Sequence, residues 1–201
     1  MMTRMHLPLI AGLIFTTIGA ELSRGTSVRQ HNLEQLTGMA SQVFVGDVIS
    51  VSQEFEPRIN GPVWVTRFEV VRPIKGVQSS QVVLRQIASR VPGQFSPIPG
   101  TPSFASKGQF LVFLHGESAL GLSSVVGVYQ GRMPIIDLPD GRKAVVGSFR
   151  ENMLLNGLSD PAVKSSLLKS TTSLTNRTGQ STRLADYTTL MGILDGMAGA
   201  H

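Results

Sequence analysis

The stretch QVFVGDVISVSQ, from Gln42 to Gln53, decides the fold because its apolar residues recur at every second position. A period of two predicts a β-strand with one buried face. Four apolar residues share one side of this strand: Val43, Val45, Ile49 and Val51. Asp47 falls in the same row, so the strand must bend or expose one end. The adjacent Gly46 is a suitable place for a β-bulge or for sharp coiling.

Further strands are predicted after this stretch. A turn at Asn60-Gly61 leads into a strand from Val63 to Arg72. The other predicted strands are 81–88, 109–114, 123–129, 131–137 and 142–146, with a hairpin turn at Pro139-Asp140-Gly141 between the last two. The segment QFLVFL at 109–114 is apolar on both faces, so we expect it to be the most buried strand.

Helices are predicted before and after the strands. One begins at the N-cap Asn32 and packs three apolar residues against the sheet: Leu33, Leu36 and Met39. A second begins at Ser159-Asp160-Pro161 and ends near Leu168. The Ser- and Thr-rich stretch from 165 to 182 is predicted to be a linker. A last helix carries an apolar docking stripe made of Leu184, Tyr187, Met191 and Leu194.

The N-terminal residues predict export. Arg4 precedes the apolar run LPLIAGLIFTTI at 7–18, and the small pair Gly19-Ala20 follows it. This order predicts a signal peptide at 1–20, because a run of about 12 to 14 apolar residues is shorter than the roughly 20 that span a bilayer. The alternative is an uncleaved membrane anchor. We expect a flexible leader at 21–31 and no membrane span after removal of the signal peptide.

The residue types present limit the kinds of active site and metal site that the chain could form. The chain has no cysteine, which excludes disulfides, thiol catalysis and cysteine-ligated zinc, and which favours a bacterial source for an exported domain. The nearest approach to a nucleophile elbow, GESAL at 116–120, has Leu120 where the second glycine is required. His115, alone at the end of a buried strand, is typical of a structural histidine. We therefore predict no catalytic residue, no cofactor and no metal site.

Positive charge is concentrated in one part of a chain whose net charge is +5. Between residues 58 and 90 there is one acidic residue, Glu69, and there are six cationic residues: Arg58, Arg67, Arg72, Lys75, Arg85 and Arg90. They predict a basic face that attracts acidic polymers or anionic surfaces. The candidate partner-binding residues are Arg67, Arg72, Arg85 and Arg90, beside a Pro-rich loop at 89–107. The alternative for the arginines is an ordinary solvated strand face. The alternative for the Pro-rich loop is a rigid cover over a barrel end.

Several of the strand segments resemble known proteins. MASQVFVGDVISV at 39–51, VTRFEVVRPIKG at 65–76 and KGQFLVFLHG at 107–116 resemble a group of uncharacterised exported bacterial proteins. Their order is similar to the netrin-like module of tissue inhibitors of metalloproteinases, which implies an OB-type barrel of five strands over residues 33–136. A coiled first strand and a long connection before the fourth agree with a small barrel. The inhibitors use an N-terminal cysteine held by disulfides, so their mechanism does not carry over.

Together these features predict a mainly β chain. We expect a small OB-type, netrin-like barrel of about five strands with an added hairpin at 32–149, and a C-terminal helical extension at 150–201. The expected role is that of an exported, non-enzymatic binding domain for another exported protein or an anionic cell-envelope polymer. The alternatives are a regulator or inhibitor of an exported protease, a nucleic-acid-binding barrel, and a hydrolase with an unrecognised site. Export and an aromatic content of only 6% argue against nucleic acid.

Overall fold

The structure, a computed structural model, describes residues 29–89, 100–147, 154–175 and 181–199. The predicted signal peptide at 1–20, the leader up to residue 28, and Arg90 with the next part of the Pro-rich loop lie outside these residues. The last leader residues are anchored by Gln130, whose amide donates to the Arg29 carbonyl over 2.9 Å and accepts from the His31 N–H over 2.7 Å.

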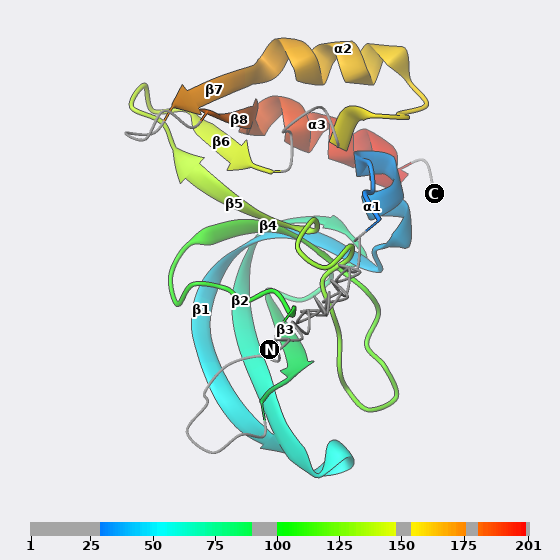
Figure 1. The fold of residues 1–201 in the computed structure, drawn as a ribbon, viewed down its shortest axis with the longest axis vertical. Coiled ribbons are helices and arrows are strands. Elements are labelled where there is room, and N and C mark those ends of the chain that lie inside the picture. The colour runs from blue at the N-terminus through cyan, green and yellow to red at the C-terminus, as the bar shows by residue number, and fades with distance from the viewer. Residues whose placement is uncertain (1–28, 90–99, 148–153, 176–180, 200–201) are drawn as a thin grey trace, which may run out of the picture.

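The described residues form one antiparallel sheet, so the mainly β prediction is confirmed (Figure 1). Its strands are β1 (Gln42–Glu56), β2 (Gly61–Lys75), β3 (Gln81–Ile87), β4 (Gln109–Leu114), β5 (Arg132–Asp137), β6 (Lys143–Val146), β7 (Thr171–Thr175) and β8 (Ser181–Asp186). They lie in the order β3-β2-β1-β4-β5-β6-β8-β7. The sheet is not closed into a barrel, because β3 and β7 are its two edges.

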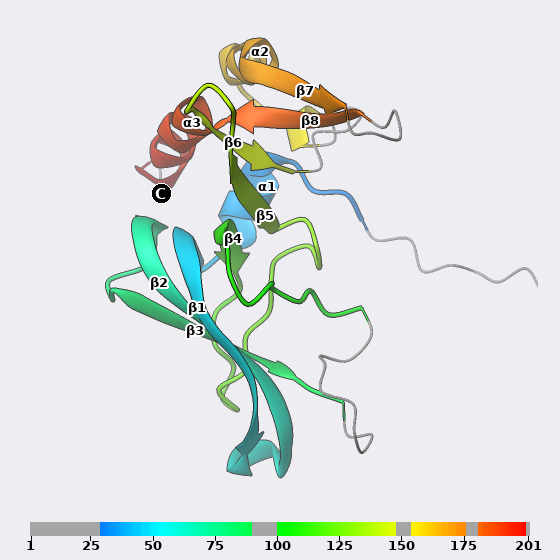
Figure 2. The same ribbon diagram turned by 90° about the vertical axis from the view of Figure 1, so that its left-hand side faces the viewer.

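Three helices gather at one end of the molecule, beside β6 to β8 (Figures 1 and 2). They are α1 (Leu33–Met39), α2 (Pro161–Ser170) and α3 (Tyr187–Gly199), and a short 3₁₀ helix, Pro57–Ile59, joins β1 to β2. The predicted N-cap Asn32 forms a capping box with Gln35, and Asp160 caps α2 ahead of Pro161. The two predicted helix starts are therefore confirmed.

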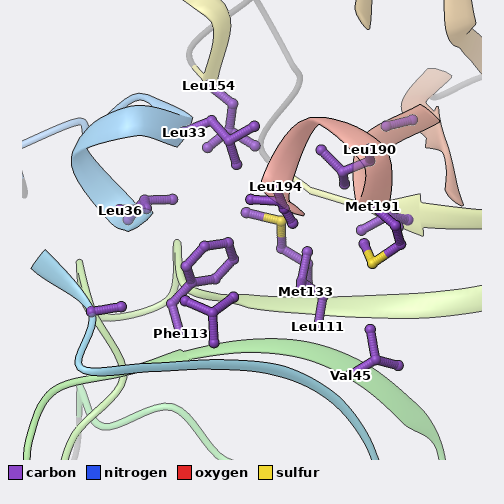
Figure 3. Close-up of a cluster of buried hydrophobic side chains, with 14 of the residues drawn as sticks. Leu33, Leu36, Val45, Leu111, Phe113, Met133, Leu154, Leu190, Met191 and Leu194 are labelled. Carbon is purple, nitrogen blue, oxygen red and sulfur yellow. The ribbon is translucent and has the colours of Figure 1, made fainter. Parts of the chain in front are cut away.

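Two apolar cores lie on opposite faces of the sheet. The helix-side core packs α1, α2 and α3 on one face, where Leu33, Leu190 and Leu194 lie above Leu111 and Phe113 (Figure 3). The inner core fills the other face within the curve of β1 to β4, and its aromatic rings are Phe44, Phe68, Phe104 and Phe110. Strand β4 supplies side chains to both cores, as its apolar sequence predicts.

Bulges coil the long hairpin of β1 and β2. The register shifts between Val45 and Gly46, as predicted for that glycine. A side chain at position 46 would lie 2.9 Å from the Phe44 ring and 3.1 Å from the Glu69 carbonyl. A second shift leaves Ile49 unpaired and 48% exposed, so this residue does not share the buried side predicted for it.

Two predictions about secondary structure are wrong. Residues 123–129 form only an isolated bridge between Val125 and Leu114, because Gly127 and Val128 both take a φ of 63° and turn the chain away. The predicted linker at 165–182 instead contains the end of α2 and the strand β7, which pairs with β8. Its threonines favour extended backbone, and an edge strand needs few apolar residues.

The predicted C-terminal stripe is divided between two elements. Leu184 lies in β8, whereas Tyr187, Met191 and Leu194 lie in α3. Leu184, Met191 and Leu194 are buried, and Tyr187 packs at the margin of the helix-side core. Since β8 pairs with β6, the segment after residue 150 continues the same sheet.

Candidate functional site

The four arginines predicted as a contact surface do not form one cluster. Arg67 lies on β2, and its Nη2 is 2.7 Å from Glu54 Oε1 on β1, while its Nη1 donates to Ser52 Oγ over 3.4 Å. This arginine is the main cause that lowers the pKa of Glu54. Its charge is therefore already shared with a carboxylate of the neighbouring strand.

Arg72 lies on the same face of the sheet as Arg67 but farther along β2, beside the helices. Its strand partner is Val45, which belongs to the helix-side core, and its guanidinium pairs with the Asp195 carboxylate on α3. Val71 is the unpaired residue of a bulge just before it. Because residues five positions apart in a regular strand point to opposite faces, this bulge returns Arg72 to the same face as Arg67. The neighbouring Lys75 is also engaged, because its ammonium donates to the Thr37 carbonyl over 2.7 Å.

Arg85 lies on β3 opposite Val65, on the same face as Arg67. Its charge helps to lower the pKa of Glu54, and also that of Glu56, behind the larger effect of Arg58. Its guanidinium has no hydrogen bond or ion pair within the described part of the chain. Arg90 lies outside the described residues. The structure thus brings Arg67 and Arg85 together on neighbouring strands, whereas Arg72 lies farther along β2 and pairs with α3.

A polar groove of about 540 Å³ runs beside β3, between that strand and the residues that follow β4. One wall is the loop after β2 and the outer edge of β3, including Gln78, Gln81 and Val83. The other wall is made by residues 114–117, which include His115 and Glu117. Sequence reasoning missed this groove, because it depends on which strand edges stay unpaired.

The hydrogen-bond pattern of β2 and β3 defines the free edge. The Val70 N–H donates to the Ser80 carbonyl over 2.8 Å, and the Ala88 N–H donates to the Pro62 carbonyl over 3.1 Å. With the regular register between the strands, these two bonds direct the backbone groups of 81, 83, 85 and 87 away from β2. The groups of Val83 have no partner on that outer side within the described residues.

The far wall is hydrogen-bonded to both neighbouring strands. The Ser123 N–H donates to the Arg85 carbonyl of β3 over 2.9 Å, and the His115 N–H after β4 donates to the Ser124 carbonyl over 2.9 Å. Within the turn, the Leu122 N–H donates to Ser118 Oγ over 3.1 Å. A short link therefore crosses from β4 to β3 at the Arg85 end and leaves the gap open beside Val83.

Ser118, the serine of the incomplete elbow motif, serves as a turn cap, and His115 is exposed at the groove wall. Nowhere in the described ranges do three or more His, Asp or Glu side chains gather so that they could hold a metal ion. The arrangement is suited to binding backbone and polar groups.

The chain matches no family model, no curated protein and no solved structure. None of the described helices combines the length and the apolar character needed to cross a bilayer. The groove and the strand edge beside it are therefore the features that bear on function.

A second cluster of polar groups lies inside the sheet. Trp64 Nε1, Thr66 Oγ1 and both amide atoms of Gln86 are buried without a hydrogen-bond partner. Trp64 and Gln86 are directly opposite each other on β2 and β3. These atoms are shielded from solvent, and the residue Gln86 also lines two pockets, of about 340 and 320 Å³, both of which Thr101 and Ser124 line with it.

Proposed function

We propose that the chain is an exported, non-enzymatic binding domain that recognises another exported protein through the groove beside β3. The observation that carries the proposal is the unpaired backbone of Val83 at an open strand edge that borders a polar groove. Edge strands are usually covered or blocked, because an open edge pairs readily with another chain. An open edge that faces a groove therefore favours a binding role.

The ion pairs favour a protein partner over an anionic polymer. A polymer held by charge needs several free cations on one surface. Arg67 and Arg72 are each already paired with a carboxylate. Arg85 is the remaining described member of the predicted set, and a single cation gives weak, salt-sensitive attraction.

The proposed fold of the binding region is an OB-type barrel of the netrin-like kind, left open on one side. Four features support it: the coiled β1, the bulges at Val71 and Ile49, the inner core enclosed by β1 to β4, and the link between β4 and β3 at residues 123–125. In this proposal the groove occupies the place where a complete fifth strand would close the barrel.

Export is proposed from the sequence pattern of residues 1–20 and from the absence of cysteine. Cleavage of the first residues from the protein recovered outside the cytoplasm is the expected result. N-terminal sequencing of that protein measures it. An intact N-terminus in the membrane fraction would instead favour the anchor.

Site-specific cross-linking tests the binding role. A photoreactive residue at Gln78, which is exposed on the groove wall, should cross-link the partner in the producing cell, whereas one at Ser166 on the exposed surface of α2 should not. The cross-linked protein is then purified, and its affinity for the full chain is measured by calorimetry. Gln78→Trp should weaken binding about tenfold or more by filling the groove, and the matched control Ser166→Trp should leave it unchanged.

Two results would overturn the proposal. In one, no protein is cross-linked selectively by the photoreactive residue at position 78 compared with the one at position 166. The other is a purified partner that binds Gln78→Trp as tightly as the unaltered chain.

A further inference from the structure

The geometry points to strand addition as the mode of binding: an extended segment of the partner enters the groove and pairs with the outer edge of β3. This inference rests on the proposed binding function and specifies the chemistry by which the groove recognises its partner. The recognised feature is extended main chain, and side chains beside the groove contribute selectivity.

The outer edge of β3 offers a short ladder of main-chain groups. Val83 presents an N–H and a carbonyl on the same side, as a residue in an extended strand does. The carbonyl of Gln81 and the N–H of Arg85 point in the same direction and have no partner within the described residues. The remaining outward groups of Gln81 and Arg85 are in use, because the Gln81 N–H donates to Ser79 Oγ over 3.2 Å and the Arg85 carbonyl accepts from Ser123.

The groove is bounded on both sides, which favours a single added strand over a sheet. An added strand lies about 4.8 Å from its neighbour, and the wall made by 114–117 stands on the far side of the gap. A second copy of this chain that paired through its own β3 would bring its β2 against that wall. A single extended segment brings no second strand with it. The volume of about 540 Å³ lies within the range of natural binding sites.

The lining favours a segment with polar side chains. The groove walls include the polar residues Ser79, Gln78 and His115. Its one carboxylate, Glu117, acts electrostatically on Arg58, whose pKa is raised mainly by hydrogen bonding to Glu56 and also by the charge of Glu117. Arg85 is the one Lys or Arg among the described residues of the lining, so the groove carries one formal charge of each sign and no strong excess of either to select the partner.

A proline at position 83 tests the mode of binding directly. Because the Val83 N–H points away from β2, Val83→Pro removes the outward donor without removing a hydrogen bond of the native ladder. Val83→Ala is the matched control, since it shortens the side chain and keeps the N–H. The probe is the tightest binder selected from a displayed library of random 12-residue peptides on the full chain.

Strand addition predicts that Val83→Pro weakens binding of this peptide about tenfold or more, whereas Val83→Ala changes it by less than about threefold. N-methylation of single peptide-backbone nitrogens should weaken binding only when the methyl group is at every second position of the peptide. This test does not depend on the folding of any protein variant. In the complex, the amides of Val83 and Arg85 should become protected from hydrogen exchange.

Each contrary outcome has a separate meaning. Equal binding by Val83→Pro and Val83→Ala, or no selected peptide, overturns strand addition. If the cross-linked partner remains sensitive to Gln78→Trp but not to Val83→Pro, the proposed binding function stands and only its mode is wrong. Protection of the Val83 amide from hydrogen exchange in the free chain would show that the edge is already paired. Protection that is independent of protein concentration would assign the pairing to a segment of this chain, and protection that rises with concentration would assign it to a second copy. Either result overturns the inference.

Discussion

The guanidinium of Arg72 on β2 pairs with the carboxylate of Asp195 on α3, 123 positions later in the chain. The pair joins the coiled hairpin to the C-terminal helix at the border of the helix-side core. Both side chains remain substantially exposed, at 41% and 47%. Burial of the adjacent Leu194, rather than the ion pair, should therefore hold α3 to the sheet.

Asp195→Asn should lower the free energy of unfolding by no more than about 1 kcal/mol, because exposed ion pairs contribute little. Leu194→Ala should lower it by about 2–5 kcal/mol, because it removes a fully buried side chain. Urea denaturation of both variants measures the two effects. A loss from Asp195→Asn as large as that from Leu194→Ala would contradict this ranking.

Stability should fall in acid partly through Glu56. Hydrogen bonds from Arg58 lower the pKa of Glu56 in the folded protein to about 2. In the unfolded chain a glutamate has a pKa of about 4.3. The contribution is therefore present above about pH 4.3 and is lost as the pH falls toward 2. Glu56→Gln should reduce the slope of stability against pH in this window, and NMR titration of the Glu56 carboxyl should report the lowered pKa. An ordinary titration midpoint would contradict the prediction.

Two buried threonines should respond in opposite ways to the same substitution. Thr66 is fully buried and its hydroxyl has no partner, whereas the Thr37 hydroxyl donates to the Leu33 carbonyl over 2.8 Å. Thr66→Val should raise the free energy of unfolding by about 1 kcal/mol, because it removes an unsatisfied polar atom. Thr37→Val should lower it by about 1 kcal/mol. Thermal and urea unfolding measure both, and a destabilised Thr66→Val would show that its hydroxyl is satisfied.

Two glycines with left-handed backbone should differ in their tolerance of alanine. Gly76 has a φ of 64°, and an added Cβ would clash with the Ser41 carbonyl oxygen, whereas Gly141 has a φ of 82° and no atom within 4 Å of such a Cβ. Gly141→Ala should cost about 1–2 kcal/mol from backbone strain alone. Gly76→Ala should cost about 2–5 kcal/mol, because strain and overpacking add. Equal losses in urea denaturation would contradict the close approach at Gly76.

Local signals in the sequence predicted much of the fold. Asn60-Gly61 and Asp140-Gly141 locate two hairpin turns, and Asn32 locates the start of α1, because turn and cap preferences act within a few residues. The prediction of a strand for SSVVGVY at 123–129 from such local signals is wrong. Its composition is that of a strand, but Val128 takes a positive φ that composition does not indicate.

The candidate site depends on relations that local patterns do not contain. Arg67 and Arg72 are five positions apart on one predicted strand, which in a regular strand would put them on opposite faces, and only the bulge at Val71 places them on the same face. Which groups of β3 remain unpaired depends on the strand order and on the Ser123 link to Arg85. Sequence reasoning identified Arg85 as a candidate, but for its charge and not for its place at the edge of the sheet.

Strand β4 has a consequence for how the molecule unfolds. Leu111 and Phe113 support the helices, while Phe110 and Val112 support the curved hairpin side, so neither half keeps its core if β4 is lost. The whole chain should therefore melt as one cooperative unit. Fluorescence of the single tryptophan, Trp64, and far-ultraviolet circular dichroism of the helices should give the same transition midpoint. In such a molecule, damage to the face that carries the helices also destabilises the distant edge that is open to a partner.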